Sequence, residues 1–470
     1  MSSLSPHIVI LGAGPGGYPA AFLASEMGMK VTLVDLESQP GGVCLHYGCI
    51  PSKALLHAAH SLHVAHEAAS FGIHFPSPEI NLDKLRSWKD TVISRLTRGL
   101  SQIAKARDVT FVQGRGRFLD DQTLRVVARD ELTDIKFDYA VVATGSRPVL
   151  PENLRLDSDY IWDSTEALSI PEIPDSLLVV GGGYVGLEMS GVYGALGSRI
   201  TIVEAANALL PGVDSDLVDV MALQLEDCVE NIWLNTTVST LVETTDGIIA
   251  TLSGPDANLV EIPFDRVLMS VGREPNVENL GLQELEIELT DSGFIQTDKQ
   301  KRTSVSNIFA IGDVTGGVML AHKASHEARV AIEAIAGLPS EWEPPVIPAV
   351  VFTEPEIAWT GITETDARRL GLDVEISKFP WSSSGRAITS NLSGGLTKII
   401  SESGTERIVG AGIVGRGASE LIGEATLAIE MAARLQDLKL TVHPHPTLSE
   451  TLMEASEIFF GTSPHHIGRR

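Results

Sequence analysis

The chain carries one pattern of apolar and polar positions twice. An apolar run, a glycine-rich turn, a longer helical segment and a second apolar run follow one another over residues 7–35 and again over 176–204. Short apolar runs bounded by glycine are typical of buried strands, and the longer segment between them is typical of a helix. Each stretch therefore predicts a unit of strand, turn, helix and strand.

Each turn has the spacing Gly-x-Gly-x-x-Gly, directly after the first apolar run and directly before the helix. The first glycine allows the tight turn, the second lets the backbone approach a pyrophosphate, and the third lets helix and strand pack closely. Free N–H groups at the helix N-terminus would then face the phosphates. Glycines that only make tight turns are the alternative, which the complete flanks disfavour. The glycines are Gly12, Gly14, Gly17, Gly181, Gly183 and Gly186.

An acidic residue stands at the end of the second apolar run of each unit. These are Asp35 and Glu204, about 20 residues beyond the turn, where dinucleotide sites place an acid. A carboxylate there accepts hydrogen bonds from a ribose 2'-hydroxyl and repels a 2'-phosphate. We therefore expect two dinucleotide sites, of which the second prefers NAD to NADP.

Further strands are expected at 137–148, 264–276 and 307–317. The last of them ends an apolar run with Gly-Asp, which places Asp313 at the carboxyl edge of a strand. Ligands of open α/β sheets gather at that edge. Asp313 is thus a candidate for binding a polyol such as the ribitol of a flavin, with an ordinary turn residue as the alternative.

Two of the three cysteines lie close together after the first turn. Cys44 and Cys49 have four residues between them, which in a cytosolic chain points to redox or metal chemistry. A zinc site usually needs four ligands, and the chain has no second cysteine pair, so we expect redox chemistry and no metal. Pro51 predicts a helix start just after Cys49, whose thiolate the helix dipole and Lys53 would stabilise. Lys53 could equally be a solvated helix lysine, and Cys228 is expected to pack.

Near the C-terminus, His445 precedes a helix expected to begin around Pro446 or Thr447, and Glu450 follows. A histidine with a near-neutral pKa can take a thiol proton, and a carboxylate can hold its ring in one tautomer. An ordinary loop histidine is an equal alternative on these residues alone.

Length and charge narrow the function classes. With 470 residues the chain should form two to four domains, and its formal net charge of -26 disfavours nucleic acid. No apolar run reaches the roughly 20 residues of a membrane helix. The sequence passes from Pro6 almost directly into an apolar run, without a recognisable leader. We therefore expect a cytoplasmic protein that binds neither membrane nor nucleic acid.

The segments GGVCLHYGCIPSK, ATGSRP, GGGYVGLE, NIFAIGD, MLAHKASHE and HPHPTLSE are specific in combination. In this order the sequence resembles the pyridine nucleotide–disulfide oxidoreductases over almost its whole length, and most of all the members that oxidise dihydrolipoyl groups with NAD. The resemblance implies an α/β fold with two Rossmann-like dinucleotide-binding domains, for FAD and NAD, and a C-terminal α+β dimerisation domain. It implies an FAD domain at 1–148 and 272–346, an NAD domain at 149–271 and a dimer-interface domain at 347–470.

The resemblance also implies residue roles. FAD would be bound by Gly12, Gly14, Gly17, Asp35, Gly116, Asp313, Ala321 and Lys53. NAD would be bound by Gly181, Gly183, Gly186, Glu204 and Gly272. Lys53 would pair with Glu188 beside the reactive nitrogen of the flavin.

The implied chemistry passes through a Cys44–Cys49 disulfide. Cys44 would meet the substrate, Cys49 would stand next to the flavin, and His445 with Glu450 would act as a base across a homodimer. The implied partner is a lipoyl-carrying protein, such as a 2-oxoacid dehydrogenase acyltransferase or the glycine-cleavage carrier.

The segment between the cysteines departs from the family. The usual Leu-Asn-Val-Gly is Leu45-His46-Tyr47-Gly48 here, and we expect His46 and Tyr47 to alter the thiolate pKa or the preference for a carrier. Another NAD(P)H-dependent disulfide reductase is an alternative. Glutathione-type members, however, usually have Pro-Lys-Lys where this chain has Pro-Ser-Lys, and the C-terminus SPHHIGRR lacks a further cysteine pair. A mainly structural subunit of a lipoyl-dependent complex is the other alternative.

Overall fold

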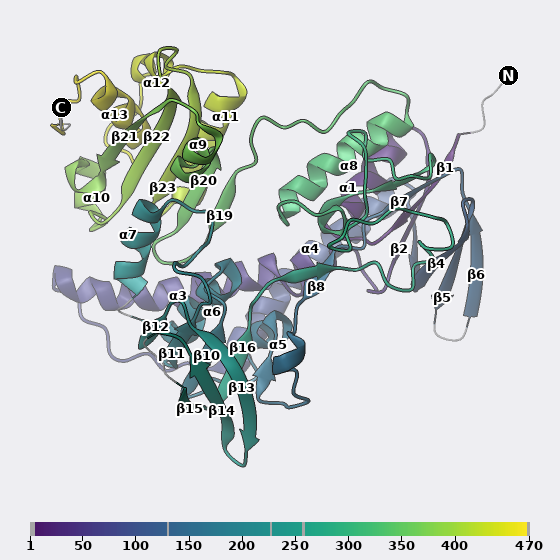
Figure 1. The fold of residues 1–470 in the computed structure, drawn as a ribbon, viewed down its shortest axis with the longest axis horizontal. Helices are drawn as coiled ribbons and strands as arrows, with labels where there is room; N and C mark the ends of the chain where they lie inside the picture. The colour runs from purple at the N-terminus through teal and green to yellow at the C-terminus, as the bar shows by residue number, and fades with distance from the viewer. Residues whose placement is uncertain (1–4, 129–130, 226–227, 256–258, 468–470) are drawn as a thin grey trace.

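The computed structural model describes residues 5–128, 131–225, 228–255 and 259–467. The chain forms three parts (Figure 1): a first nucleotide unit in purple and green, a second in teal, and a C-terminal unit in yellow-green. The predicted α/β fold class is confirmed. Within the described residues, no helix is long and apolar enough to cross a membrane.

The first nucleotide unit is built on a five-stranded parallel sheet. In its central strand Ile8, Val9, Ile10 and Leu11 are buried, as expected for a parallel strand covered on both faces. Helices α1 (Gly17–Glu26) and α8 (Ala321–Ile335) cover one face, and an antiparallel sheet covers the other. In spatial order the parallel strands are β18 (Ile308–Ala310), β7 (Tyr139–Val142), β1 (His7–Leu11), β2 (Lys30–Asp35) and β3 (Thr110–Gln113). The covering sheet is β4 (Arg115–Asp120), β5 (Thr123–Ala128) and β6 (Glu131–Lys136).

The second nucleotide unit repeats this plan. Helix α6 (Tyr184–Leu196) follows its glycine turn, as the sequence pattern predicts. The parallel strands are, in spatial order, β12 (Asn231–Trp233), β11 (Arg199–Val203), β10 (Ser176–Val180), β16 (Arg266–Met269) and β9 (Ile161–Trp162). The antiparallel sheet against it is β13 (Thr237–Thr244), β14 (Gly247–Ser253) and β15 (Val260–Phe264).

A short antiparallel ribbon joins the two nucleotide units. The chain leaves the first unit through β8 (Ser146–Pro148) and returns through β17 (Arg273–Pro275), which pairs with it. The second unit is therefore inserted into the first, while the domain boundaries given above stay a prediction.

The C-terminal unit is an antiparallel sheet with helices packed on it. Its buried core includes Trp381, Phe379 and Ile413. In spatial order the strands are β19 (Ala349–Val351), β20 (Ile357–Gly361), β23 (Ile408–Val414), β22 (Leu396–Glu402) and β21 (Val374–Pro380). The helices are α9 (Glu364–Leu370), α10 (Gly385–Thr389), α11 (Ala418–Glu430), α12 (Leu435–Leu440) and α13 (Glu450–Phe459).

The remaining helices lie within these parts or between them. The cysteine segment forms α2 (Gly42–His46) and the start of α3 (Cys49–Glu67), and α3 packs against α6 of the second unit. The others are α4 (Leu82–Ala106), α5 (Ser164–Ser169) and α7 (Ser215–Leu225), with the 3-10 turns η1 (Ala68–Phe71), η2 (Glu152–Leu154), η3 (Gly312–Thr315) and η4 (Trp381–Ser383).

Candidate active site

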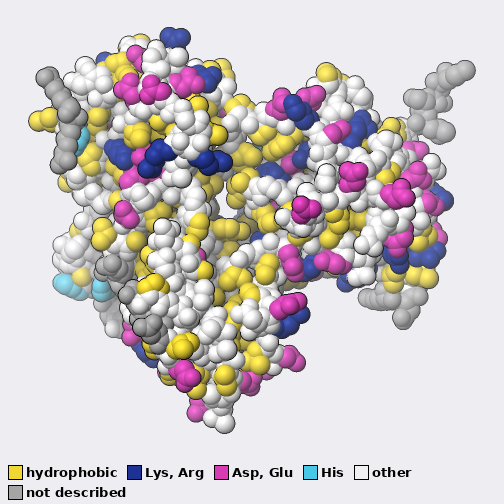
Figure 2. Space-filling model, viewed as in Figure 1, with side chains coloured by type: hydrophobic (Ala, Val, Ile, Leu, Met, Phe, Trp, Pro, Cys, Tyr) yellow, Lys and Arg dark blue, Asp and Glu magenta, His cyan; other side chains and the backbone are white. Residues whose placement is uncertain are grey.

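A large cavity collects most of the predicted site residues. Its volume is about 690 Å³, and it lies between the first turn, the cysteine segment and helix α6. The surface is visibly hollowed between the two nucleotide units (Figure 2). The predicted residues in its wall are Gly12, Gly14, Asp35, Cys44, Cys49, Lys53, Gly116, Glu188, Asp313 and Ala321.

The first turn has the backbone that its sequence requires. Gly12 has a φ of +102°, and a Cβ there would lie 2.2 Å from the carbonyl oxygen of Ala143. No other residue fits this turn without moving the neighbouring strand. Gly14 borders the cavity and Gly17 begins α1, so the helix N-terminus is directed at the space that a pyrophosphate would fill.

The two predicted acids are held in the same way. The N–H of Ala13 donates to Asp35 Oδ2 at 2.5 Å and that of Glu37 donates to Oδ1 at 2.8 Å. In the second unit Gly182 and Ala206 donate to the two oxygens of Glu204, each at 2.7 Å. Each carboxylate oxygen retains capacity to accept a further hydrogen bond, as binding of ribose hydroxyls requires.

The second site is otherwise open. Gly183, at the N-cap of α6, has no atom within 4 Å of where a Cβ would stand. Gly181 has a φ of +109° and Gly272 one of +137°, so both turn positions need glycine. Gly186 and Gly272 are outside the wall of the large cavity.

Cys44 and Cys49 are in contact as thiols. The hydrogen bond from Cys44 lowers the pKa of Cys49 to about 7, against the effect of burial and with help from the charge of Lys53. The same hydrogen bond and burial raise the pKa of Cys44. Cys49 is the first residue of α3, where the sequence predicted a stabilised thiolate.

Lys53 and Glu188 form the predicted contact. Lys53 Nζ lies 2.8 Å from both carboxylate oxygens of Glu188, which is 4% exposed. Ser52 Oγ donates to the same carboxylate at 2.7 Å, and the N–H of Phe352 donates to it at 3.2 Å. The buried charge therefore has a full set of partners.

Asp313 is held by residues that the sequence did not single out. Ser146 Oγ donates to Asp313 Oδ2 at 2.6 Å, and Arg273 Nε donates to that hydroxyl at 2.7 Å. The N–H of Gly312 donates to the buried Glu327 at 2.7 Å. Two buried lysines, Lys301 and Lys323, lie 2.8 and 3.1 Å from Glu327. The only signal for Glu327 was its place in MLAHKASHE.

The C-terminal pair is formed, but the predicted helix start is wrong. His445 Nδ1 lies 2.9 Å from Glu450 Oε1, and the ring is 70% exposed, outside the wall of the cavity. Helix α13 begins at Glu450, not at Pro446 or Thr447. The N–H of Thr447 instead donates to Glu450 Oε2 at 2.7 Å, so these residues form a turn closed by the side chain.

A second histidine supports this loop and was not predicted. His443 Nε2 lies 2.7 Å from Glu424 Oε1 on α11, and its Nδ1 lies 2.9 Å from the carbonyl oxygen of Thr441. The paired motif His-Pro-His-Pro was the available signal.

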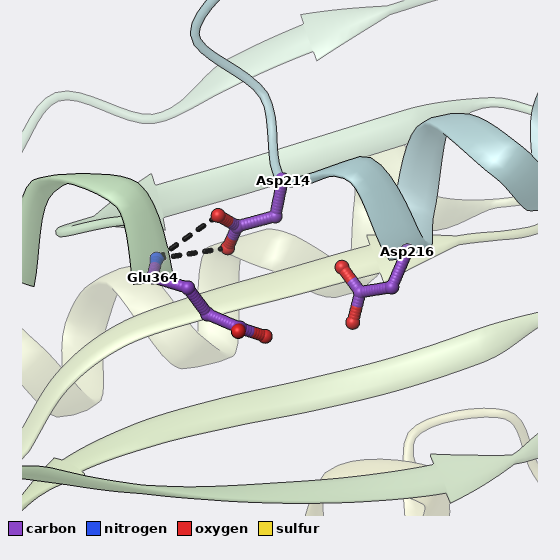
Figure 3. Close-up of side chains that lie close together, drawn as sticks. All are labelled: Asp214, Asp216 and Glu364. Carbon is purple, nitrogen blue, oxygen red and sulfur yellow. Dashed lines mark hydrogen bonds between the residues drawn. The ribbon is translucent and has the colours of Figure 1, made fainter. Parts of the chain in front are cut away.

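Asp214, Asp216 and Glu364 converge between α7 and the C-terminal unit (Figure 3). The centre of this cluster already contains a cation, because the Nζ of the buried Lys398 lies 2.6, 2.7 and 3.1 Å from the three carboxylates. Lys378 contacts two of them as well. The cluster is therefore an ion-pair network that joins the second unit to the C-terminal unit, and it gives no support for a metal.

Known proteins are similar in sequence to this chain over nearly its whole length. Residues 6–328 match the family described as pyridine nucleotide-disulphide oxidoreductase, and residues 347–456 match its dimerisation domain. The dihydrolipoyl dehydrogenase of Haemophilus influenzae is 45% identical over 462 residues, covering 98% of this chain and 96% of that one. The dihydrolipoyl dehydrogenase of Halobacterium salinarum is 40% identical over 470 residues, covering 99% of each.

Solved structures of flavoprotein disulfide reductases and related proteins have the same fold as this chain. LpdA from Mycobacterium tuberculosis superposes with a TM-score of 0.89 at 27% identity, covering 97% of this chain and 99% of that one. The HOCl-induced flavoprotein disulfide reductase RclA from Escherichia coli gives 0.86 at 26% identity, covering 96% and 99%. The predicted likeness to the members that oxidise dihydrolipoyl groups is thus confirmed by curated relatives of nearly equal length, and the chain belongs to the pyridine nucleotide–disulphide oxidoreductase family.

Proposed function

We propose that this chain is a dihydrolipoyl dehydrogenase, which oxidises protein-bound dihydrolipoyl groups with NAD through Cys44 and Cys49. The observation that carries the proposal is the thiol pair itself. Two cysteines in contact, one with its pKa lowered to about 7, stand in the wall of a cavity between two dinucleotide turns. The names of the full-length relatives supply the substrate class.

The first site fits FAD. Its wall combines the N–H groups of a glycine turn, the ribose-binding geometry of Asp35, a polar group at Asp313 and the thiol pair, in one continuous cavity. Bound there, FAD would supply the two-electron redox chemistry that links the dithiol to NAD. The second turn with Glu204 fits NAD, because its open glycine leaves room for a pyrophosphate.

The chain's own residues carry out the thiol exchange. In the oxidised enzyme Cys44 and Cys49 form a disulfide, and the structure shows the reduced thiols. His445 takes the proton of one substrate thiol, and the thiolate formed attacks the sulfur of Cys44. The disulfide breaks, and Cys49 leaves as a thiolate that Lys53 stabilises. The second substrate thiol then attacks the first substrate sulfur, and the bond from that sulfur to Cys44 breaks. The proton of the second thiol passes to Cys44, which leaves as a thiol, and the lipoyl disulfide is released.

We expect the base to come from a second copy of the chain. His445 is on the C-terminal unit, outside the wall of the cavity that holds the cysteines. The match of residues 347–456 to a dimerisation domain supports a homodimer in which His445 and Glu450 of one copy serve the cysteines of the other. The partner is a lipoyl-carrying protein, for which the acyltransferase of a 2-oxoacid dehydrogenase and the glycine-cleavage carrier are the candidates.

The proposal is tested by anaerobic turnover of dihydrolipoamide with NAD. Fast turnover with NAD, slow turnover with NADP and none of glutathione disulfide with NADPH are expected. Cys44→Ser and Cys49→Ser should abolish turnover, while Cys228→Ser, outside the cavity wall, is the matched control. Absence of lipoamide turnover in a protein whose bound flavin NADH still reduces would move the substrate elsewhere in the family. A protein that binds a carrier but shows no flavin reduction would indicate a structural subunit.

A further inference from the structure

His46 and Tyr47, which depart from the family pattern between the two cysteines, contact residues beside the first nucleotide site. Tyr47 Oη donates to Glu37 Oε1 at 2.7 Å, and His46 Nε2 lies 3.2 Å from the carbonyl oxygen of Gln39. Both partners are in the loop that follows β2. The pKa shifts of the two thiols arise instead from each other, from burial and from nearby charges that include Lys53. The contacts of His46 and Tyr47 therefore do not support the predicted effect of these residues on the thiolate pKa.

Tyr47 and Glu37 belong to the wall of the large cavity. Tyr47 follows α2, and Glu37 stands two residues beyond Asp35 at the end of β2. The N–H of Glu37 donates to Asp35 Oδ1 at 2.8 Å. A continuous line of polar contacts thus runs from the cysteine segment to the acid of the first turn. The Tyr47–Glu37 contact therefore ties together two elements that border the same space.

The second nucleotide unit has no side chain that could form a contact like that of Glu37 with Tyr47 at the corresponding position. Its acid, Glu204, receives N–H groups from Gly182 and Ala206, just as Asp35 receives them from Ala13 and Glu37. The position that corresponds to Glu37 is therefore Ala206, which has no group to bond a tyrosine. The contact is a feature of the first site and not of the dinucleotide turn in general.

We propose that Tyr47 and Glu37 form a clasp over the adenosine diphosphate half of the nucleotide in the first site and slow its release. The inference rests on the proposed function, in which that nucleotide is FAD. The side chain of Asp35 is one methylene shorter than that of Glu204. The carboxylate of Glu37 and the hydroxyl of Tyr47 add polar groups next to Asp35. We expect a ligand held between α2 and the loop after β2 to leave faster once the Tyr47–Glu37 contact is removed.

The test measures release of FAD from the purified holoenzyme by the rise in flavin fluorescence after dilution. Tyr47→Phe keeps the ring and removes the hydroxyl, and it should speed release about three- to tenfold, as expected for loss of one solvent-exposed hydrogen bond. Glu37→Gln should act in the same direction, and the double variant should release FAD no faster than Tyr47→Phe alone. Tyr160→Phe, which removes an exposed tyrosine hydrogen bond to Thr245 in the second unit, should leave release unchanged.

A parallel titration of the Cys49 thiolate separates the clasp from a role in thiol chemistry. The clasp predicts an unchanged titration in Tyr47→Phe together with faster FAD release. A shifted titration with unchanged release would overturn the clasp in favour of the thiolate effect. Unchanged release with an unchanged titration, in a holoenzyme that carries FAD, would also overturn it and leave the proposed function intact. A wild-type protein that binds no FAD would instead remove the proposed function.

Discussion

Lys53 and Glu188 come from different units of the chain and meet in an ion pair, with Nζ 2.8 Å from both carboxylate oxygens. Lys53 is on α3, one turn after Cys49, and Glu188 is on α6 of the second nucleotide unit. The pair fixes a positive and a negative charge beside the same thiol. The charge of Lys53 lowers the pKa of Cys49 and that of Glu188 raises it. The thiolate is thus sensitive to both partners.

We predict opposite shifts when either partner of this pair is neutralised. Lys53→Met should raise the pKa of Cys49 above its value of about 7, and Glu188→Gln should lower it, each by about one pH unit. In Lys53→Met the thiolate then disappears at a higher pH as the solution is acidified, and in Glu188→Gln at a lower pH. The ultraviolet absorbance of the thiolate in the reduced protein, followed against pH, measures both.

An exposed lysine outside the cavity wall provides the control for this titration. Lys105 is exposed near the end of α4, and Lys105→Met should titrate like the unchanged protein. If Lys53→Met and Glu188→Gln move the curve in the same direction, the opposed charges do not set the pKa of Cys49.

Loss of the Glu450 carboxylate should impair proton transfer at His445. Glu450→Gln keeps the side-chain size but removes the charge 2.9 Å from His445 Nδ1, so the ring is no longer held as a base. We expect kcat for dihydrolipoamide with NAD to fall about 100-fold, within the range typical of general-base catalysis. Reduction of the bound flavin by NADH does not use this base and should keep its rate.

The pair formed by His465 and Glu454 is a matched control, because it also joins a C-terminal histidine to a carboxylate on α13. His465→Gln should leave turnover near that of the unchanged protein. Equal losses in Glu450→Gln and His465→Gln would mean that the C-terminal unit is disturbed as a whole and that Glu450 has no specific role.

We predict that Glu204 determines the selectivity for NAD over NADP. Its carboxylate is fixed by two backbone N–H groups at 2.7 Å, so it cannot turn away from an approaching 2'-phosphate. Glu204→Gln removes the repulsion, and the ratio of kcat/KM for NAD over NADP should fall at least about tenfold. Asp35→Asn in the first unit should leave that ratio unchanged. A ratio that stays constant in Glu204→Gln would show that selectivity arises elsewhere.

Local features of the site could be predicted because their determinants are close in sequence. Each nucleotide turn needs glycines, an apolar strand and an acid within about 30 residues, and these form β1, α1 and β2 as predicted. The second copy forms β10, α6 and β11 in the same way. Cys49 likewise begins α3 because Pro51 suits a first helical turn.

Long-range and side-chain effects could not be predicted in this way. Ser146 donates to Asp313 across 167 positions, and no local pattern marks such a contact. The start of α13 was misplaced because Glu450 binds the N–H of Thr447, which replaces the first turn of the expected helix. The Tyr47–Glu37 contact was missed for a related reason, since spacing alone does not show that Tyr47 points toward the loop after β2.

Two glycines of the second turn should separate folding from nucleotide binding. A Cβ on Gly186 would lie 2.1 Å from the carbonyl oxygen of Gly181, so Gly186→Ala must move the helix from the strand and should cost about 2 kcal/mol of stability. Gly183→Ala has free space and a φ of -80°, so the fold should be unchanged, but its methyl group would occupy the side where a pyrophosphate approaches. Thermal unfolding and NADH affinity should be measured for both variants. Only Gly186→Ala should lower the Tm. Gly183→Ala should keep the normal Tm and bind NADH at least about tenfold more weakly. Wild-type NADH affinity in Gly183→Ala would mean that the nucleotide does not approach this turn.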